Sequence, residues 1–408
     1  MLDTNKIKAH FPVLNNNPKL SYLDSAASSL KPIEVIESVT NYYTNLGVNV
    51  HRGVYDLSYR ATDLYESART KIQKFINAKH EEEIVFTRGA SASLNLVAMS
   101  YGMKYVNKGD EVITSELEHH SSHMPWFNVC KVKGATLKYV PLTKEGRITV
   151  ENFMSVLTDK TKVVALTYVS NVMGYITPIK EIIKICHERG IVVSVDGAQA
   201  VPHMKIDVQD LDCDFLSFSG HKMCGPTGIG VLYGKYKLLD SMDPIEFGGD
   251  MADEVYKDSQ TYKAVPHKFE TGTPIIAGVI GLGRAVEFLD EIGLDEIARH
   301  ENELATIAKK RLLELSDVEV YNETAETGVV AFNIKGVHPH DAATIYDKNG
   351  VCIRAGHHCA QLITRFLGQI STTRASFYMY NTMEDVDNLV NSVKEARDFF
   401  KQFWFGGR

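Results

Sequence analysis

The chain has 408 residues, of which 44% are hydrophobic and 23% charged, and its formal net charge is -7. This composition is typical of a globular protein of two or three domains, and the acidic balance argues against a general nucleic-acid-binding protein. No hydrophobic run reaches the roughly 18 residues of a membrane-spanning helix, and the N-terminal residues lack the apolar core of a secretory signal. None of the six cysteines forms a C-x-x-C pair, so we expect a reduced, cytoplasmic protein that binds neither membrane nor nucleic acid.

Between residues 82 and 235, hydrophobic runs rich in Val, Ile and Tyr alternate with amphipathic stretches, such as 93–106 and 179–189. This alternation predicts an α/β domain with a mainly parallel sheet covered on both faces. Little helix separates the last three runs, so at least one of them is expected to be antiparallel. The predicted strands are 83–87, 111–115, 137–142, 163–170, 191–196, 215–219 and 229–233.

The pattern changes after about residue 275, which predicts a smaller α+β domain. A helical region covers 276–315, with a break at Gly293, and shorter elements follow it. We expect an N-terminal segment (1–20) that packs on the small domain, a large domain (21–275) and a small C-terminal domain (276–408). The shorter elements are strands at 318–321, 329–334 and 351–354, and helices at 340–348 and 383–399.

Lys222 is the most informative residue for function. It follows the predicted strand 215–219, and Asp196 ends another predicted strand. A lysine and a carboxylate at the ends of neighbouring strands are what pyridoxal phosphate (PLP) requires. The lysine forms a Schiff base, and the carboxylate keeps the pyridine nitrogen protonated. A lone lysine is usually a surface cation, but the glycines near Lys222 let backbone approach a ligand closely. Gln199, three residues after Asp196, strengthens this interpretation.

A phosphate group would need its own donors. The segment Thr87-Arg88-Gly89-Ala90-Ser91 joins a predicted strand to a predicted helix. Backbone N–H groups at a helix N-terminus bind anions, and the hydroxyl of Ser91 adds a donor. The alternative is an ordinary glycine turn in which serine caps the helix. Ser219 and His221 are further candidate donors.

The histidines at 119, 120 and 123 raise the question of a metal site. The H-E-x-x-H pattern is absent, so we predict no metal. The functional alternative is an imidazole stacked on the cofactor ring.

Cys359 is the second strong local signal. His357 and His358 precede it, and Arg354 is near in sequence. Cationic neighbours favour a nucleophilic thiolate, whereas a buried, inert thiol is the alternative, and local composition does not decide between them.

Two other polar residues stand in suggestive places. Arg374 is isolated in an uncharged stretch from 366 to 380, which is typical of carboxylate capture and almost equally of a structural ion pair. Asn171 follows a predicted strand, where it is placed to donate to a cofactor or a substrate.

Taken together, these motifs resemble the class V aminotransferase branch of the fold-type-I PLP enzymes, and within it the group II cysteine desulfurases of SufS type. The resemblance covers essentially the whole chain. It implies a large domain with a mainly parallel seven-stranded sheet and a smaller α+β domain. The motifs are Val50-His51-Arg52-Gly53, Glu118-His119-His120-Ser121, Val169-Ser170-Asn171, Asp196-Gly197-Ala198-Gln199, Ser219-Gly220-His221-Lys222, Phe269-Glu270-Thr271-Gly272-Thr273-Pro274, Arg354-Ala355-Gly356-His357-His358-Cys359-Ala360 and Arg374-Ala375-Ser376.

The resemblance also implies a role for each matching residue. Lys222 would carry PLP, and Cys359 would be the nucleophile. Three residues would contact the cofactor ring: Asp196 at the pyridinium, Gln199 at the ring hydroxyl oxygen and His119 stacked on the ring. The phosphate would be held by Ala90, Ser91, Ser219 and His221. Thr273 would reach the same phosphate from the second subunit of a homodimer. The substrate side would comprise Asn171, Arg374, His51 and Arg354.

Two departures from the family pattern are visible. Ala90-Ser91 stands where two threonines are usual, so the phosphate cradle would rest more on backbone groups. Leu362 stands where proline is usual, which would loosen the segment behind Cys359.

The implied reaction is conversion of L-cysteine to L-alanine with a persulfide on Cys359. The persulfide would pass to a SufU- or SufE-type acceptor for iron–sulfur cluster assembly. The alternative within the same fold is a selenocysteine lyase acting on L-selenocysteine.

Overall fold

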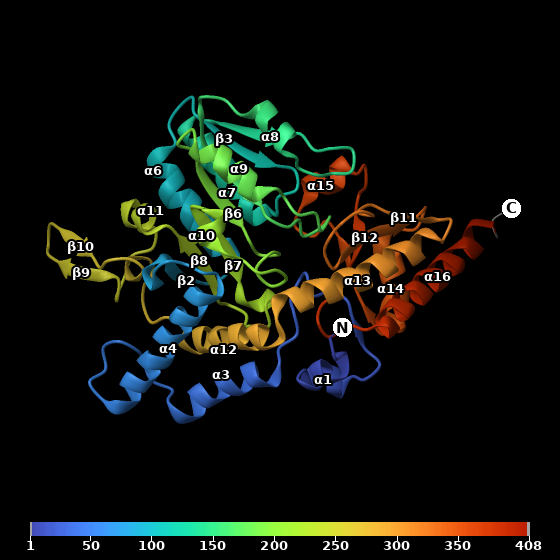
Figure 1. Cartoon of the computed structure of the whole chain (residues 1–408), viewed down its shortest axis with the longest axis horizontal. Helices are drawn as coiled ribbons and strands as arrows, with labels where there is room; N and C mark the ends of the chain where they lie inside the picture. Colours follow the sequence, from blue (N-terminus) through green and yellow to red (C-terminus); the bar gives the residue numbers. More distant parts are fainter. Residues whose placement is uncertain (1, 406–408) are drawn as a thin grey trace.

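The computed structural model describes residues 2–405, and its large domain is built on a seven-stranded sheet (Figure 1). The strand order is β2-β8-β7-β6-β5-β3-β4. Strand β8 is antiparallel to both of its neighbours, and the other pairs are parallel. This arrangement confirms the mainly parallel sheet and the expected antiparallel strand. The strands are β2 (Ile84–Thr87), β3 (Glu111–Ser115), β4 (Thr136–Val140), β5 (Thr161–Thr167), β6 (Val192–Asp196), β7 (Phe215–Ser219) and β8 (Gly230–Gly234).

The bounds of β3 and β7 agree with the predicted ones, whereas β5 ends three residues before the predicted end at 170. Beyond Thr167 the chain turns back on itself, because Val169 bridges to Ile176 and the Ser170 N–H donates to the Tyr175 carbonyl. The apolar run therefore continues into a buried loop that has left the sheet. This loop brings Asn171 towards the small domain.

Helices cover both faces of this sheet, as the parallel pairing requires. The predicted helix at 93–106 begins at Ala90 and contains a π-helical segment, Val97–Gly102, between α5 (Ala90–Leu96) and α6 (Met103–Tyr105). The remaining helices of this part are α3 (Ile33–Asn45), α4 (Asp56–Phe75), α7 (His120–Lys133), α8 (Val150–Val156), α9 (Ile179–His187), α10 (Val208–Leu211), α11 (Tyr236–Ser241) and α12 (Ile276–Ile292).

Helix α12 leads to the small domain. The predicted break at Gly293, whose φ is 91°, separates α12 from α13 (Leu294–Leu313). The small domain contains an antiparallel sheet in the order β11-β12-β15-β14. Its strands are β11 (Val318–Val320), β12 (Val329–Ile334), β14 (Arg354–Gly356) and β15 (Thr372–Ser376), and its other helices are α14 (Pro339–Lys348), α15 (Gln361–Phe366) and α16 (Met383–Phe405).

The N-terminal segment lies against residues from far along the chain. The Phe11 ring packs edge-on against the rings of Phe288 and Tyr380, and Lys8 forms an ion pair with Asp385 at 3.8 Å. The elements here are α1 (Thr4–Ala9), α2 (Pro12–Asn16) and β1 (Ser21–Tyr22), which pairs in parallel with β13 (Val351–Cys352).

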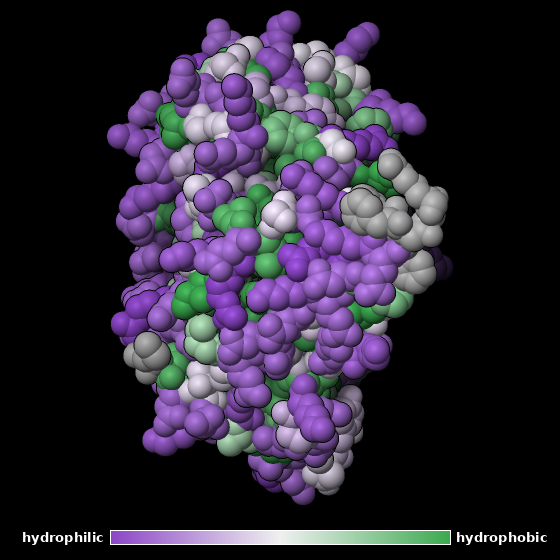
Figure 2. All heavy atoms as spheres, turned by 90° about the vertical axis from the view of Figure 1, so that its right-hand side faces the viewer, coloured by the Kyte–Doolittle hydropathy of each residue, from purple (hydrophilic) through white to green (hydrophobic). Residues whose placement is uncertain are grey.

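The face that carries α16 is mostly hydrophilic, with hydrophobic side chains scattered in small patches (Figure 2). At the opposite end of the molecule, the hairpin of β9 (Ala252–Val255) and β10 (Gln260–Tyr262) projects from the body (Figure 1). Among the residues that the structure describes, no helix is long and apolar enough to cross a membrane.

Candidate active site

A cavity of about 250 Å³ lies at the carboxyl ends of β5, β6 and β7, where the small domain meets the large one. Carboxyl ends of neighbouring parallel strands are the usual place for ligand sites in α/β sheets. Most residues that the sequence singled out line this cavity: Ala90, Ser91, His119, Asn171, Asp196, Gln199, Ser219, His221, Lys222, Arg354, Cys359 and Arg374.

Lys222 and Asp196 are positioned by adjacent strands. Asp196 is the last residue of β6 and is 4% exposed, and its Oδ1 accepts a hydrogen bond from the Ala198 N–H at 2.9 Å. Lys222 closes a short turn directly after β7. Burial lowers the pKa of the Lys222 amine to about 8, although the nearby Asp196 opposes that shift. At neutral pH about a tenth of the amine is therefore uncharged and nucleophilic, far more than at the ordinary lysine pKa of 10.5.

The phosphate side of the cavity is built where β2 meets α5. Gly89 adopts φ of 148°, which favours glycine, and the Ala90 N–H donates to the Ser219 hydroxyl at 2.7 Å. Ser91 shares a hydrogen bond of 2.6 Å with Ser121 at the start of α7. Burial, then the positive charge of Lys222, lowers the pKa of His221 to about 4, so its imidazole is neutral.

His119 caps helix α7, since its Nδ1 accepts from the Ser121 N–H at 3.1 Å. Burial lowers the pKa of this imidazole to about 4, so it offers a neutral aromatic face to the cavity. Glu118 precedes His119 in the chain and is buried. Its Oε1 accepts from the Thr167 N–H at 3.0 Å and from the Ser115 hydroxyl at 2.7 Å, and it thereby joins the ends of β5 and β3.

Arg374 is held inside the cavity by two groups of the chain. It is 2% exposed and comes from the middle of β15. Its Nη1 donates to the backbone carbonyl of Asn171 at 2.9 Å, and its Nη2 donates to Asp24 at 3.3 Å. Its Nε is buried and has no partner among the described residues. The guanidinium thus keeps an unused donor for an anion.

Cys359 lies on a loop of the small domain that touches the large domain. His358 and Cys359 both have positive φ, 53° and 55°. The Cys359 carbonyl accepts from the His120 N–H at 2.7 Å, and the His358 carbonyl accepts from the Asn171 side chain at 2.8 Å. Cys359 itself is exposed. Of the sequence alternatives, the structure therefore rejects the buried thiol.

His358 does not supply a cationic neighbour that would favour a thiolate at Cys359. Burial, followed by the charge of Arg374, lowers the pKa of His358 to about 3. Its Nε2 instead pairs with Thr372 at 3.0 Å. His358 therefore fixes the loop and adds no charge.

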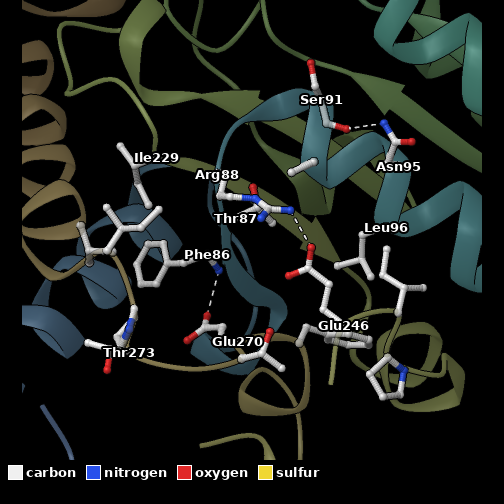
Figure 3. Close-up of a pocket in the computed structure, with 18 of the residues that line it drawn as sticks. Phe86, Thr87, Arg88, Ser91, Asn95, Leu96, Ile229, Glu246, Glu270 and Thr273 are labelled. Carbon is white, nitrogen blue, oxygen red and sulfur yellow. Dashed lines mark hydrogen bonds and ion pairs between the residues drawn. The ribbon is translucent and has the colours of Figure 1, made fainter. Parts of the chain in front are cut away.

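Two predicted residues, His51 and Thr273, do not line this cavity. His51 pairs with Glu66 at 2.8 Å and lines a separate small hollow. Thr273 lines a larger cavity of about 690 Å³ (Figure 3). There the Phe86 N–H donates to Glu270 at 2.8 Å, and an ion pair joins Arg88 to Glu246. Ser91 lines both the large cavity and the one around Lys222.

Sequence reasoning missed three residues that shape the site. Asp24 contacts Arg354 and Arg374. Lys31 donates to the His221 carbonyl at 2.9 Å. Glu118 was noted only as part of a motif. Asp24 and Lys31 carry no local signal, since each acts on residues about 190 or more positions away in sequence.

Within the described residues, no group of three or more His, Cys, Asp or Glu side chains is arranged to hold a metal ion.

Comparison with known proteins agrees with this geometry. The sequence profile described as Aminotransferase class-V matches residues 21–389. This chain belongs to the class-V aminotransferase family. Among its relatives, "Probable cysteine desulfurase" of Halalkalibacterium halodurans is 54% identical over 98% of this chain and 99% of the relative. "Probable cysteine desulfurase" of Staphylococcus epidermidis is 50% identical over 98% of each.

Solved structures of cysteine desulfurases have the same fold. The enzyme CsdA from Escherichia coli superposes with a TM-score of 0.92 at 40% identity, covering 98% of this chain and 99% of that one. A cysteine desulfurase from Thermococcus onnurineus has a TM-score of 0.93 at 38% identity, with the same coverage. The chain is thus a PLP-dependent enzyme of fold type I within the cysteine desulfurase group.

The residues present fit PLP. Asp196 is a buried carboxylate placed for a protonated ring nitrogen, and Lys222 is an amine placed for an aldehyde. The backbone at Gly230 leaves no room for a side chain, because a Cβ there would lie 2.4 Å from the Gly89 Cα. This close approach positions the start of α5 as an anion cradle.

Proposed function

We propose that this chain converts L-cysteine to L-alanine and carries the released sulfur as a persulfide on Cys359. One observation carries the proposal: the Lys222 amine, the Arg374 guanidinium and the Cys359 thiol all line one cavity. Proton transfer at Cα, carboxylate binding and sulfur capture each need one of these groups within reach of the same small molecule.

Arg374 is proposed to bind the substrate carboxylate. Its Nε lacks a partner, and a guanidinium recognises a carboxylate through paired N–H donors. Asn171 forms the neighbouring wall and anchors Arg374 through its backbone carbonyl. Together they orient the substrate so that its side chain faces the loop of Cys359.

Lys222 is proposed to move the proton at the substrate Cα. Because its pKa is about 8, the amine exchanges protons readily near neutral pH. PLP, when bound, supplies the electron sink that stabilises the electron pair left at Cα. The neutral imidazole of His119 forms the wall above this position and excludes water from it.

Cys359 is proposed to take the sulfur as a thiolate. Its Sγ attacks the substrate sulfur, so that an S–S bond forms while the substrate Cβ–S bond breaks. The electron pair of the broken bond remains on Cβ and is then protonated. The products are L-alanine and one persulfide on Cys359, and no external oxidant or reductant is consumed.

The direct test is to incubate the PLP-loaded enzyme with L-cysteine and measure the mass of the peptide that contains Cys359. We expect one added sulfur atom on that peptide. The Cys359→Ala variant should keep bound PLP and its visible absorption but lose alanine formation from L-cysteine. Cys352→Ala is the matched control, because Cys352 is only partly buried and does not line the cavity.

Wild-type alanine formation by the Cys359→Ala variant would refute this role. The same pair of variants also tests the lyase alternative. Retained turnover of L-selenocysteine, together with lost turnover of L-cysteine, is the result expected if selenium leaves without a thiol nucleophile.

A protein acceptor of SufU or SufE type is proposed to remove the persulfide for iron–sulfur cluster assembly. The exposed position of Cys359 supports this step, because a thiol on another protein must reach it. We expect addition of such an acceptor to raise the steady rate of alanine formation and to empty the persulfide from Cys359.

We further propose that two copies form a homodimer through the large cavity of Figure 3. Its lining includes the exposed side chains of Ile245 (39%) and Ile275 (40%), and Phe247 (61%) lies two residues after Ile245. Such exposed apolar side chains favour a protein partner. Ser91 connects this cavity to the one around Lys222. A second copy seated there would bring Thr273 towards the phosphate position of its neighbour.

A further inference from the structure

Strand β6 leads directly into a helically coiled segment, residues 197–204. Within it, the N–H groups of Val201 and Met204 each donate to the carbonyl four residues earlier. Gln199 and His203 are also four residues apart, and side chains at this spacing lie on the same side of a helical turn. Both of them line a small cavity of about 10 Å³ between the large and small domains.

Gln199 connects this small cavity to the cofactor site, because it lines both cavities. Its Nε2 donates one hydrogen bond to the Ala26 carbonyl at 2.7 Å. An amide nitrogen carries two hydrogens, so a second donor remains for a ligand. The family resemblance places that donor at the ring hydroxyl oxygen of PLP.

The far end of the segment is held by the small domain. His203 Nδ1 lies 2.8 Å from Oε2 of Glu301 in α13, and these two side chains are 12% and 2% exposed. The Tyr378 hydroxyl donates to the Pro202 carbonyl at 2.9 Å, and the Tyr378 ring packs edge-on against the His203 ring, with 4.7 Å between the ring centroids. Two separate parts of the small domain therefore hold the same two neighbouring residues.

Neither His203 nor Glu301 takes part in the proposed reaction. A buried imidazole and a buried carboxyl group lose their contacts with water, and a hydrophobic pair of similar size avoids that cost. What the polar pair adds is a directional bond that fixes the end of the segment. We propose that His203 and Glu301 are positioning residues that hold this segment and thereby keep the Gln199 amide in place for the ring oxygen of PLP. They tie this cofactor contact to the domain that provides Cys359.

The test measures the pH midpoint at which the absorption of bound PLP changes. Gln199→Ala removes the donor to the ring oxygen and should shift this midpoint by roughly one pH unit, the effect of one hydrogen bond to an ionised group. Glu301→Leu breaks the bond to His203 and fills the space of the glutamate. It should shift the midpoint in the same direction by roughly 0.5 pH unit, because the donor is loosened and not removed.

A double-variant cycle separates positioning from a general loss of stability. If Glu301 acts through Gln199, the double variant Gln199→Ala with Glu301→Leu should show only the shift of Gln199→Ala. Additive shifts would overturn the proposal, and so would a wild-type midpoint in Glu301→Leu. A purely structural role would lower the melting temperature and leave the midpoint where it is.

Two further variants examine the pair from both sides. Glu301→Gln removes the charge but keeps a hydrogen-bonding group beside His203, so it should keep the wild-type midpoint. A midpoint that moves as far as in Glu301→Leu would mean that the charge acts at a distance, which contradicts a positioning role. His203→Phe keeps a ring against Tyr378 but lacks Nδ1, and it repeats the test if Glu301→Leu does not fold. A wild-type midpoint in His203→Phe would also contradict the inference.

The matched control is His300→Phe. His300 precedes Glu301 in α13 and is 7% exposed, and its Nε2 pairs with the Asn381 carbonyl at 2.8 Å. This change disturbs the same helix without touching the 197–204 segment, so the midpoint should stay at the wild-type value. The inference goes beyond the proposed sulfur transfer and is judged separately from it, because the midpoint is measured on bound PLP without L-cysteine.

Discussion

At the scale of single residues, burial sets the protonation of the groups that do the chemistry. Lys222 and His119 are both shifted towards their neutral forms, the lysine to a pKa of about 8 and the histidine to about 4. In each case the largest cause is removal from water, which disfavours the charged form. The cavity thus offers an amine that is a nucleophile and a ring that does not repel a cationic cofactor.

The pH dependence of cofactor attachment tests this account of Lys222. Only the neutral amine attacks the aldehyde of PLP, so attachment should become faster as pH rises and level off above about pH 8, the pKa of Lys222. The rate is measured from the absorption change when PLP is added to cofactor-free enzyme. A midpoint near the ordinary lysine value of 10.5 would contradict the assignment. Lys222→Ala, which has no amine, is the blank.

Glu118 gives a prediction about stability. Burial raises its pKa from 4.5 to about 8, so between these values the folded chain holds a proton that the unfolded chain has released. The Glu118 contribution to stability therefore falls as pH rises through this window. Glu118→Gln lacks this penalty, so its unfolding free energy relative to wild type should rise by roughly 2–3 kcal/mol between about pH 5 and about pH 7.

Thermal or urea unfolding at the two pH values measures this difference. Glu111→Gln is the control, because the Glu111 pKa is lowered, with hydrogen bonds from Thr158 and Lys138 outweighing the effect of burial. A Glu118→Gln difference that does not change with pH would show that the carboxyl is ionised in the folded protein.

Residues that carry chemistry could be found from the sequence because each has a marked setting. Asp196 ends a predicted strand, Lys222 closely follows another, and Cys359 and Arg374 lie in distinctive motifs. Asp24 could not be found this way. Its importance arises only from contact with Arg354 and Arg374, 330 and 350 positions further along.

At the scale of elements, hydrophobic periodicity predicted strands and long helices but not the turns between them. The break between α12 and α13 was predictable because Gly293 stands between two amphipathic helical patterns. Strand β15 was missed because its sequence, Thr372-Thr373-Arg374-Ala375-Ser376, is almost entirely polar, although every residue of it is buried. The β9–β10 hairpin was missed because its strands are exposed and polar.

Helix α12 packs closely against α4 at Gly283, which has no side chain to keep the two helices apart. A Cβ on Gly283 would lie 2.8 Å from the Cβ of Ala68 and 3.1 Å from its Cα, so the backbone of α4 would have to shift to make room. We expect Gly283→Val to lower the unfolding free energy by about 1–3 kcal/mol through overpacking.

Urea unfolding measures this effect, with Glu291→Ala on the exposed side of the same helix as the control. A more stable Gly283→Val variant would mean that the two helices can separate without cost.

At the scale of the whole molecule, the proposed homodimer explains why His51 and Thr273 lie outside the cavity of their own chain. The division into residues 1–20, 21–275 and 276–408 stays a prediction, to be tested by limited proteolysis. The hairpin that projects from the body exposes Val255 (67%) and Tyr256 (61%), which supports a role in contacting a second copy (Figure 1).

Charge placed at the proposed contact should separate the two copies. We expect the double variant Phe247→Glu with Ile275→Glu to sediment as a monomer and to lose PLP affinity, because Thr273 would no longer reach the neighbouring phosphate site. Ile370→Glu is the matched control, since Ile370 is 79% exposed but lies in the small domain, outside the large cavity. A dimeric double variant would place the contact elsewhere.

The loop that carries Cys359 is fastened to the large domain on both sides. Besides the carbonyl bonds described above, the Gln361 N–H donates to the His120 ring at 3.1 Å. A tether this short gives the sulfur little room to swing outward. We therefore expect the persulfide sulfur to be transferred at the mouth of the cavity. The acceptor protein would then have to insert its thiol on a projecting loop, because the Cys359 loop cannot carry the sulfur outward.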